Sequence, residues 1–92
     1  MPQTAELWSH PGNFAIIQLP ERAYPGVVVQ GDTLNALIDQ IQTMRALLQA
    51  NDLQALAEEI EDLQEQLSSA RVHYEQVCSG RGVGLPYAKQ AP

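Results

Sequence analysis

The fold of this chain is decided by residues 32–79, DTLNALIDQIQTMRALLQANDLQALAEEIEDLQEQLSSARVHYEQVCS, a stretch without proline or glycine. Apolar side chains recur in it every three or four residues, which is the spacing of one face of an α-helix. The apolar positions are Leu34, Leu37, Ile41, Met44 and Leu48, followed by Leu53, Leu56, Ile60, Leu63, Leu67, Ala70, Tyr74 and Val77. The pattern predicts two helices, over residues 33–50 and 52–79.

The boundary between the two predicted helices falls at Asn51 and Asp52, where the apolar stripe loses its phase between Leu48 and Leu53. Asn51 is a suitable N-cap for the second helix, with Gln54 at the spacing of a capping box. We therefore predict a short turn and an antiparallel pair of helices. The alternative is one unbroken helix from residue 33 to residue 79.

The outer ends of the helical stretch carry further signals. Asp32 is the predicted N-cap of the first helix, because its carboxylate can accept a first-turn N–H. Gly80 lies where a C′ glycine commonly ends a helix. The second helix is the longer one by about nine residues, or roughly 13 Å. Its uncovered end, residues 70–78, has to be covered either by the N-terminal strands or by another subunit.

Residues 1–31 hold four of the six prolines and have the composition of a β-type segment. Two apolar runs, at 14–19 and 27–30, are rich in residues that favour strands, and prolines and glycines bound them. Residues 6–10 are a candidate third strand. A hairpin alone is marginally stable in water, so these strands must pack on the helices or on another chain.

These signals together predict an α+β fold. A short N-terminal β-hairpin packs on a long antiparallel two-helix hairpin, and an irregular C-terminal tail follows. The 92 residues are the size of one domain. Within that domain, 1–92, we distinguish the β-type segment 1–31, the helical hairpin 32–79 and the tail 80–92.

Charge and composition exclude several classes of function. Eleven acidic and five basic residues give a net charge of −6. Proteins that bind nucleic acids or anionic membranes carry basic faces, so neither partner is expected. No apolar run is long enough to span a bilayer, and the N-terminus lacks a signal-peptide pattern. The single cysteine, Cys78, favours a reducing, cytoplasmic location, and it leaves too few ligands for an ordinary zinc site. We expect no metal and no cofactor.

No group of residues has the spacing of a catalytic site. His10 and His73 have no nucleophile in a recognisable setting, and Cys78 lies at the end of a helix dipole that does not activate a thiolate. Several carboxylates share the face of the second helix opposite its leucine stripe, and a solvated helix face explains them. They are Glu58, Glu61, Asp62 and Glu65. We predict no catalytic residue and a protein that is not an enzyme.

The best candidate for an anion-binding site is the strand-to-helix turn Gly31-Asp32-Thr33, which has free N–H groups. Positive charge for such a ligand would come from arginines elsewhere in the chain, namely Arg22, Arg45, Arg71 and Arg81. Asp32 opposes this hypothesis, because its own carboxylate can occupy the N–H donors. A structural role for Asp32 as a helix cap is therefore the favoured interpretation.

The stretch AYPGVVVQGDTL, residues 23–34, carries a resemblance to a known family. An aromatic-Pro-Gly, three aliphatic residues and Gln-Gly-Asp-Ser/Thr-Leu resemble a family of small uncharacterised bacterial proteins, and Leu85-Pro86-Tyr87 is similar to its C-terminal segment. The family is a domain of unknown function, so the resemblance implies no activity. It implies a role for six residues of this stretch: Pro25, Gly26, Gln30, Gly31, Asp32 and Thr33.

The long leucine-rich stripe, with the spacing of a coiled coil, favours self-association. A chain of this length buries only about two-thirds of its unfolded surface, and a thin hairpin buries less, so a second copy would complete the core. We expect a non-enzymatic oligomeric interaction protein, most simply a homodimer, that acts as an adaptor, inhibitor or accessory protein. The expected interface residues are Leu56, Ile60, Leu63, Leu67, Tyr74 and Val77. The alternative is a small-molecule binder that sequesters an anionic metabolite or nucleotide signal at an oligomer interface.

Overall fold

The computed structural model describes residues 4–88, and its elements follow the predicted order. Three strands, β1 (Glu6–Leu7), β2 (Phe14–Gln18) and β3 (Gly26–Val29), precede two helices, α1 (Gly31–Gln49) and α2 (Leu53–Gly80). The α+β class, the N-terminal strands and the two-helix hairpin are confirmed. The prediction of a turn between the helices is also confirmed, because α1 ends before Asn51 and α2 begins after Asp52.

The strands form one antiparallel sheet in the order β1-β2-β3, so the predicted hairpin gains a third strand. That strand is shorter than the expected 6–10, although Trp8 N–H still donates to the Ile16 carbonyl at 2.8 Å. In the β2–β3 register Phe14 pairs with Val29, and Ile16 pairs with Val27. Paired side chains lie on the same face of a sheet, so these four apolar residues share one face.

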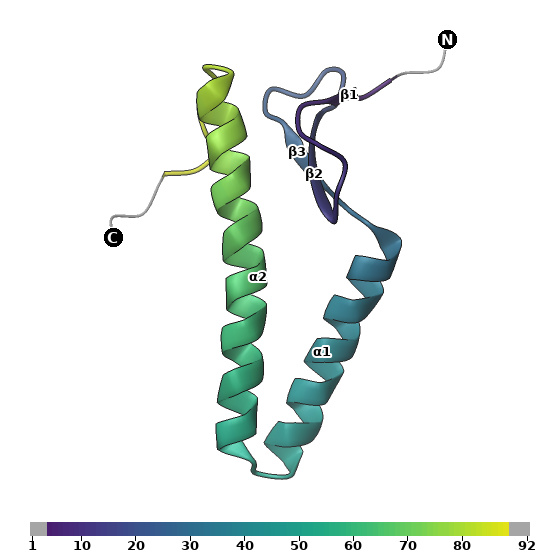
Figure 1. Ribbon diagram of the computed structural model, residues 1–92, viewed down its shortest axis with the longest axis vertical. Coiled ribbons are helices and arrows are strands. Elements are labelled where there is room, and N and C mark those ends of the chain that lie inside the picture. The colour runs from purple at the N-terminus through teal and green to yellow at the C-terminus, as the bar shows by residue number, and fades with distance from the viewer. Residues whose placement is uncertain (1–3, 89–92) are drawn as a thin grey trace.

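The sheet lies at the open end of the helical hairpin, beside the C-terminal half of α2 (Figure 1). The buried core is small and sits at this junction: Ile16 and Cys78 are fully buried and Tyr74 is 6% exposed. Partly buried side chains pack around it, namely Trp8, Val77, Val83 and Leu85. Of the two ways to cover the end of α2, the chain uses its own strands.

The turn between the helices differs in detail from its prediction. Asn51 is not the N-cap of α2: it adopts the left-handed conformation, φ 58°, as the C′ residue of α1. Its N–H donates to the Leu48 carbonyl at 3.1 Å and the Asp52 N–H to the Leu47 carbonyl at 2.9 Å, which is the Schellman pattern. Asp52 is the N-cap of α2 instead, and its carboxylate accepts the Ala55 N–H at 3.2 Å. The expected capping box of Asn51 and Gln54 was therefore wrong. Asn51 ends α1, and Asp52 caps α2.

The two outer ends also require correction. The N-cap of α1 is Gln30, without a side-chain cap bond, and Asp32 lies inside the first turn. The Asp32 carboxylate accepts the adjacent Thr33 N–H at 2.9 Å. At the end of α2 the residue with positive φ, 68°, is Gly82 and not Gly80. Bonds from Gly82 N–H to the Ser79 carbonyl and from Val83 N–H to the Cys78 carbonyl form a second Schellman motif, which directs Val83 into the core.

A polar cluster joins the two helices across their contact. The Gln40 amide donates to the Glu59 carboxylate at 3.3 Å and to the Asp62 carboxylate at 3.0 Å. The Gln66 amide donates to Gln40 Oε1 at 3.1 Å and to Asp62 at 2.9 Å. Asp62 was expected on a face that is only solvated, and it instead helps to fix the pairing of the helices.

Candidate functional site

Both helices expose a row of large aliphatic side chains. On α1 the row is Leu34, Ile38, Ile41 and Leu48, and on α2 it is Leu53, Ile60 and Leu67. Leu48 and Leu53, at the closed end of the hairpin, are 60% and 59% exposed. We call these seven residues the apolar strip.

The geometry of an antiparallel pair places both rows on one side of the hairpin. On α1 each strip residue follows a half-buried residue by one position, as Ile41 follows Gln40, and on α2 Ile60 follows Glu59 in the same way. Gln40 and Glu59 are bonded to each other, so they mark the line of contact between the helices. Successive residues point about 100° apart around a helix axis. In an antiparallel pair, the residue that follows one on the contact line therefore points to the same side of the pair on both helices. The opposite side carries polar and acidic residues: Asp39, Thr43, Glu58, Asp62 and Glu65.

The shape of the chain leaves this strip uncovered. Its radius of gyration is 16.4 Å, against about 12 Å for an ordinary domain of this length. The chain exposes 6943 Å², whereas a monomer of this mass exposes about 5,300 Å². The difference is about 1,600 Å², which is of the order of the area that each chain buries in an obligate dimer.

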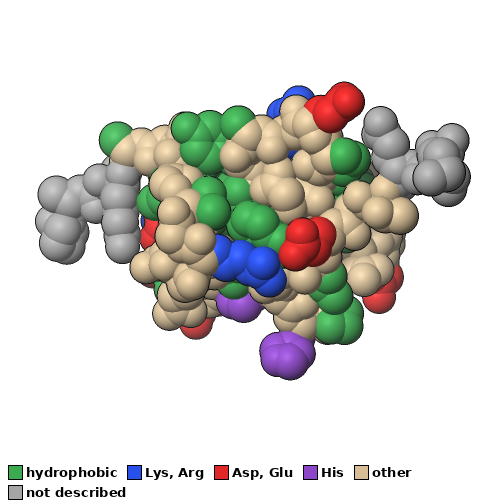
Figure 2. Space-filling view, turned by 90° about the horizontal axis from the view of Figure 1, so that it is seen from above, with side chains coloured by type: hydrophobic (Ala, Val, Ile, Leu, Met, Phe, Trp, Pro, Cys, Tyr) green, Lys and Arg blue, Asp and Glu red, His purple; other side chains and the backbone are tan. Residues whose placement is uncertain are grey.

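An apolar groove continues the strip towards the sheet. It has a volume of about 350 Å³ and lies between the exposed part of the sheet face and α2. Its lining comes from the strands, the helix and the tail: Phe14, Val27, Val29, Leu67, Ala70, Arg71, Tyr74 and Tyr87. Leu67 belongs both to the strip and to the groove. Figure 2 views the molecule from the sheet end and shows hydrophobic side chains reaching the surface there, with basic and acidic side chains beside them near the centre of this face.

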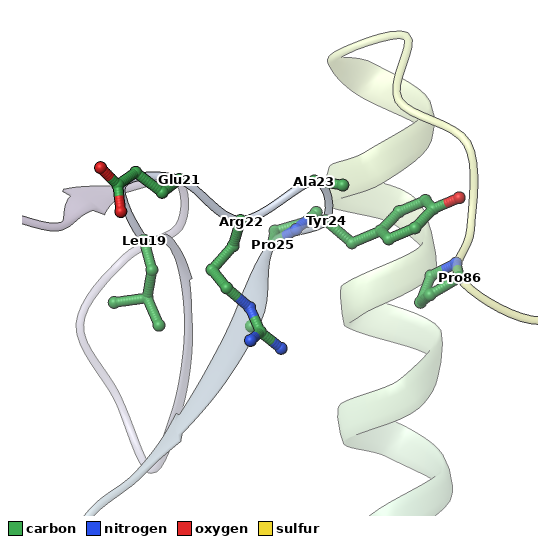
Figure 3. A pocket seen from close by; sticks show the side chains of 8 residues that line it. Leu19, Glu21, Arg22, Ala23, Tyr24, Pro25 and Pro86 are labelled. Carbon is green, nitrogen blue, oxygen red and sulfur yellow. The ribbon is translucent and has the colours of Figure 1, made fainter.

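A second cavity, of about 590 Å³, lies at the loop between β2 and β3. Tyr24 and Pro86 form one wall, while the side chains of Leu19 and Arg22 project together on the other side (Figure 3). The Gln18 amide fixes the loop by donating to the carbonyls of Leu19 and Arg22. Because Glu21 directs its carboxylate away from the Arg22 guanidinium, the two charges do not meet (Figure 3).

The Tyr74 hydroxyl holds the other end of this loop, donating to the Pro25 carbonyl at 2.7 Å. Burial, and then the neighbouring Cys78, raise the pKa of Tyr74 to about 12. The Tyr87 hydroxyl, on the ring stacked against Tyr74, donates to Glu75 at 3.0 Å. Burial, followed by that bond, raises the pKa of Tyr87. Both phenols are therefore neutral structural groups at pH 7.

The residues predicted for an anion site lie apart in the single chain. Arg22 lines the loop cavity, Arg71 lines the groove, and Arg45 stands on the exposed surface of α1. Arg81 stacks on the Trp8 ring at 4.5 Å and pairs with Glu6 at 3.5 Å, a contact that the sequence did not suggest. At the turn Gly31-Asp32-Thr33, the Asp32 carboxylate already occupies the Thr33 N–H.

The predicted interface residues divide into three groups. Ile60 and Leu67 belong to the apolar strip, whereas Leu56 and Leu63 are half-buried on the side that faces α1. Tyr74 and Val77 lie in or against the core, so the strands already take the place that we assigned to a partner there. The strip also contains five exposed residues that the predicted interface does not include, namely its four residues on α1 and Leu53. The available signal was Ile38, which widens the stripe of α1 beyond the face that one neighbour can cover.

Across residues 4–88 there is no cluster of three metal-binding side chains, and no helix is long and apolar enough to cross a membrane. What the geometry defines is a small α+β protein with an amphipathic helical hairpin. The chain belongs to a family of unknown function, DUF6959, whose profile matches residues 1–87. Neither a curated protein nor a solved structure matches it.

Proposed function

We propose that this protein is a non-enzymatic interaction protein that works as a homodimer. In the dimer, the apolar strips of two hairpins face each other and form a four-helix bundle, with a sheet on each chain. The acidic sides of the hairpins remain in solvent. The observation that carries the proposal is the single continuous side on which Leu34, Ile38, Ile41 and Leu48 meet Leu53, Ile60 and Leu67.

The composition of that side supports a second copy as its occupant. Exposed aliphatic side chains on both helices cannot be covered by any other described part of the chain, since the strands are committed to the far end of α2. The excess exposed area, about 1,600 Å² per chain, is of the size that obligate homodimers bury. The seven strip residues are uncharged. Arg45, on the same side of α1 between Ile41 and Leu48, is exposed, and its long side chain can carry the guanidinium to the edge of the interface.

The experiment compares two variants of α1 by sedimentation velocity. Ile41→Asp places a charge in the strip, while Ala46→Asp makes the same charge change at an exposed position outside the strip. The two-fold axis of the dimer repeats each substitution, so Ile41→Asp removes two isoleucine side chains from the interface. Each is worth about 1.5–3 kcal/mol, and their loss should raise the dimer dissociation constant at least a hundredfold. Ala46→Asp should leave it within threefold. Equal sedimentation of Ile41→Asp and wild type, or a wild type that is monomeric at micromolar concentration, would refute the proposal.

The remaining features of the proposal follow from charge and chemistry. A net charge of −6 and an acidic side of α2 repel phosphates, so we propose no nucleic-acid partner. A buried free Cys78 suits a reducing, cytoplasmic location, and the Gln-Gly-Asp-Thr-Leu motif suits a bacterial source. The dimer would then act on a further protein as an adaptor, inhibitor or accessory subunit.

A further inference from the structure

The groove between the sheet and α2 has the make-up of a small-molecule site. Ligand pockets are about 300–1,000 Å³ and mostly apolar, with a few polar groups that orient the ligand. This groove measures about 350 Å³, and its walls are aliphatic and aromatic. The stacked rings of Tyr74 and Tyr87, with centroids 6.5 Å apart, give it one rigid side. Val27 and Val29, on β3, stay exposed on the opposite side because α2 packs on Ile16 of the neighbouring strand β2.

Among residues 4–88, Arg71 is the only charged residue that lines the groove. Within residues 4–88 the one ion pair joins Arg81 to Glu6. The carboxylate of Glu75, one helical turn along α2 from Arg71, accepts the Tyr87 hydroxyl at 3.0 Å. The guanidinium is near enough to Tyr87 to lower the pKa of its hydroxyl, against the larger effects of burial and Glu75. A cation therefore stands at the edge of an otherwise apolar groove.

We propose that the groove binds a small amphipathic anion, an apolar chain or ring that carries a carboxylate. The apolar part would lie against Val27, Val29 and Leu67, and the carboxylate would bind the Arg71 guanidinium, whose fork matches it in a bidentate pair. The net negative charge of the chain does not attract an anion, so apolar contact with the groove walls supplies most of the affinity. Arg71 supplies the preference for a carboxylate over a neutral group. The groove adjoins the apolar strip only at Leu67, so this proposal goes beyond dimer formation.

The test is a titration of the ¹³C-labelled full chain with decanoate and, as a neutral match, with decanamide. Decanoate should shift the methyl resonances of Val27, Val29 and Leu67 and bind about tenfold more tightly than decanamide, the effect of one charge-assisted hydrogen bond. Arg71→Gln should remove that difference while decanamide binding stays the same. Arg45→Gln, the same change on α1 away from the groove, should keep the preference for decanoate. Ala70→Leu, which fills the groove with a good helix former, should weaken both ligands.

The outcomes separate this proposal from the dimer. If neither ligand moves the groove methyls, or if both bind equally to wild type and Arg71→Gln, the groove is not a carboxylate site. If the methyls respond only in Ile41→Asp, a second copy fills the groove and this proposal is wrong while the dimer stands. Binding by a wild type that proves monomeric would support the groove and refute the dimer.

Discussion

The hydroxyl of Tyr74 should measurably stabilise the fold, because it links the core to the loop between β2 and β3. The Tyr74 O–H donates to the carbonyl of the buried Pro25 at 2.7 Å, and the residue is only 6% exposed. Tyr74→Phe removes this donor and leaves the ring. A buried carbonyl that loses its partner costs about 1–3 kcal/mol, so the free energy of unfolding at pH 7 should fall by about that amount.

The same group predicts a specific response to alkaline pH. Below pH 10 the phenol is neutral in both the folded and the unfolded chain. Above its ordinary pKa the unfolded state loses the proton, while the folded state, whose pKa is about 12, keeps it. The unfolded state then binds fewer protons, so stability falls as pH rises from 10 to 12, by a total of about 2–3 kcal/mol. Tyr74→Phe should lack this component.

The assay is urea unfolding followed by the fluorescence of Trp8, the only tryptophan, which packs on the same core. Protein concentration is held fixed, because dimer formation would contribute to the measured stability. Tyr24→Phe is the matched control, since it removes a hydroxyl from a ring that is 46% exposed, and it should change stability by less than about 0.5 kcal/mol. A Tyr74→Phe variant as stable as Tyr24→Phe at pH 7, or one that follows wild type between pH 10 and 12, would refute the reasoning.

Three further predictions concern the turns and the core. Asn51→Gly should keep or slightly raise the melting temperature, whereas Asn51→Ala should cost about 1 kcal/mol, because residue 51 has a φ of 58°; equal melting of the two variants would contradict the left-handed assignment. Asp52→Ala should cost about 0.5–2 kcal/mol in thermal unfolding through the lost cap, and more than Asp32→Ala, whose carboxylate bonds only the next residue; the reverse order would restore Asp32 as the main cap. The fully buried Cys78 should react with a thiol reagent only as fast as the chain unfolds, and rapid labelling in native buffer would show that this core opens locally.

The sequence predicted the helical hairpin well, because its information there is local. An unbroken 3-4 spacing on each side of Asn51 is enough to place two helices and a turn. The caps were assigned one or two residues away. At the inner turn, Asn51 and Asp52 both suit an N-cap, and only the backbone shows that Asn51 adopts the left-handed conformation. Gly80 and Gly82 posed the same ambiguity at the end of α2.

The candidate sites depended on information that is not local. Tyr74 follows the stripe of α2 and looked like an interface residue, but the strands fold back over it through contacts with Ile16, far away in sequence. Which side of the helix pair remains open depends on the rotation of each helix against its neighbour. That rotation is fixed by Gln40, Glu59 and Gln66, polar residues that carry no periodic apolar signal. The groove unites three segments of the chain, and no spacing within any one segment indicates it.

The most direct test of the central claim is an isotope-filtered NOE experiment on a mixture of ¹³C-labelled and unlabelled chains. This measurement detects only contacts between different copies. A dimer built on the apolar strip should give intermolecular NOEs at the methyl groups of Ile38, Ile41 and Ile60 and none at Thr43, on the opposite side of α1. Their absence from the three isoleucines at concentrations where the chain is associated, or their appearance at Thr43 instead, would contradict a dimer built on the apolar strip.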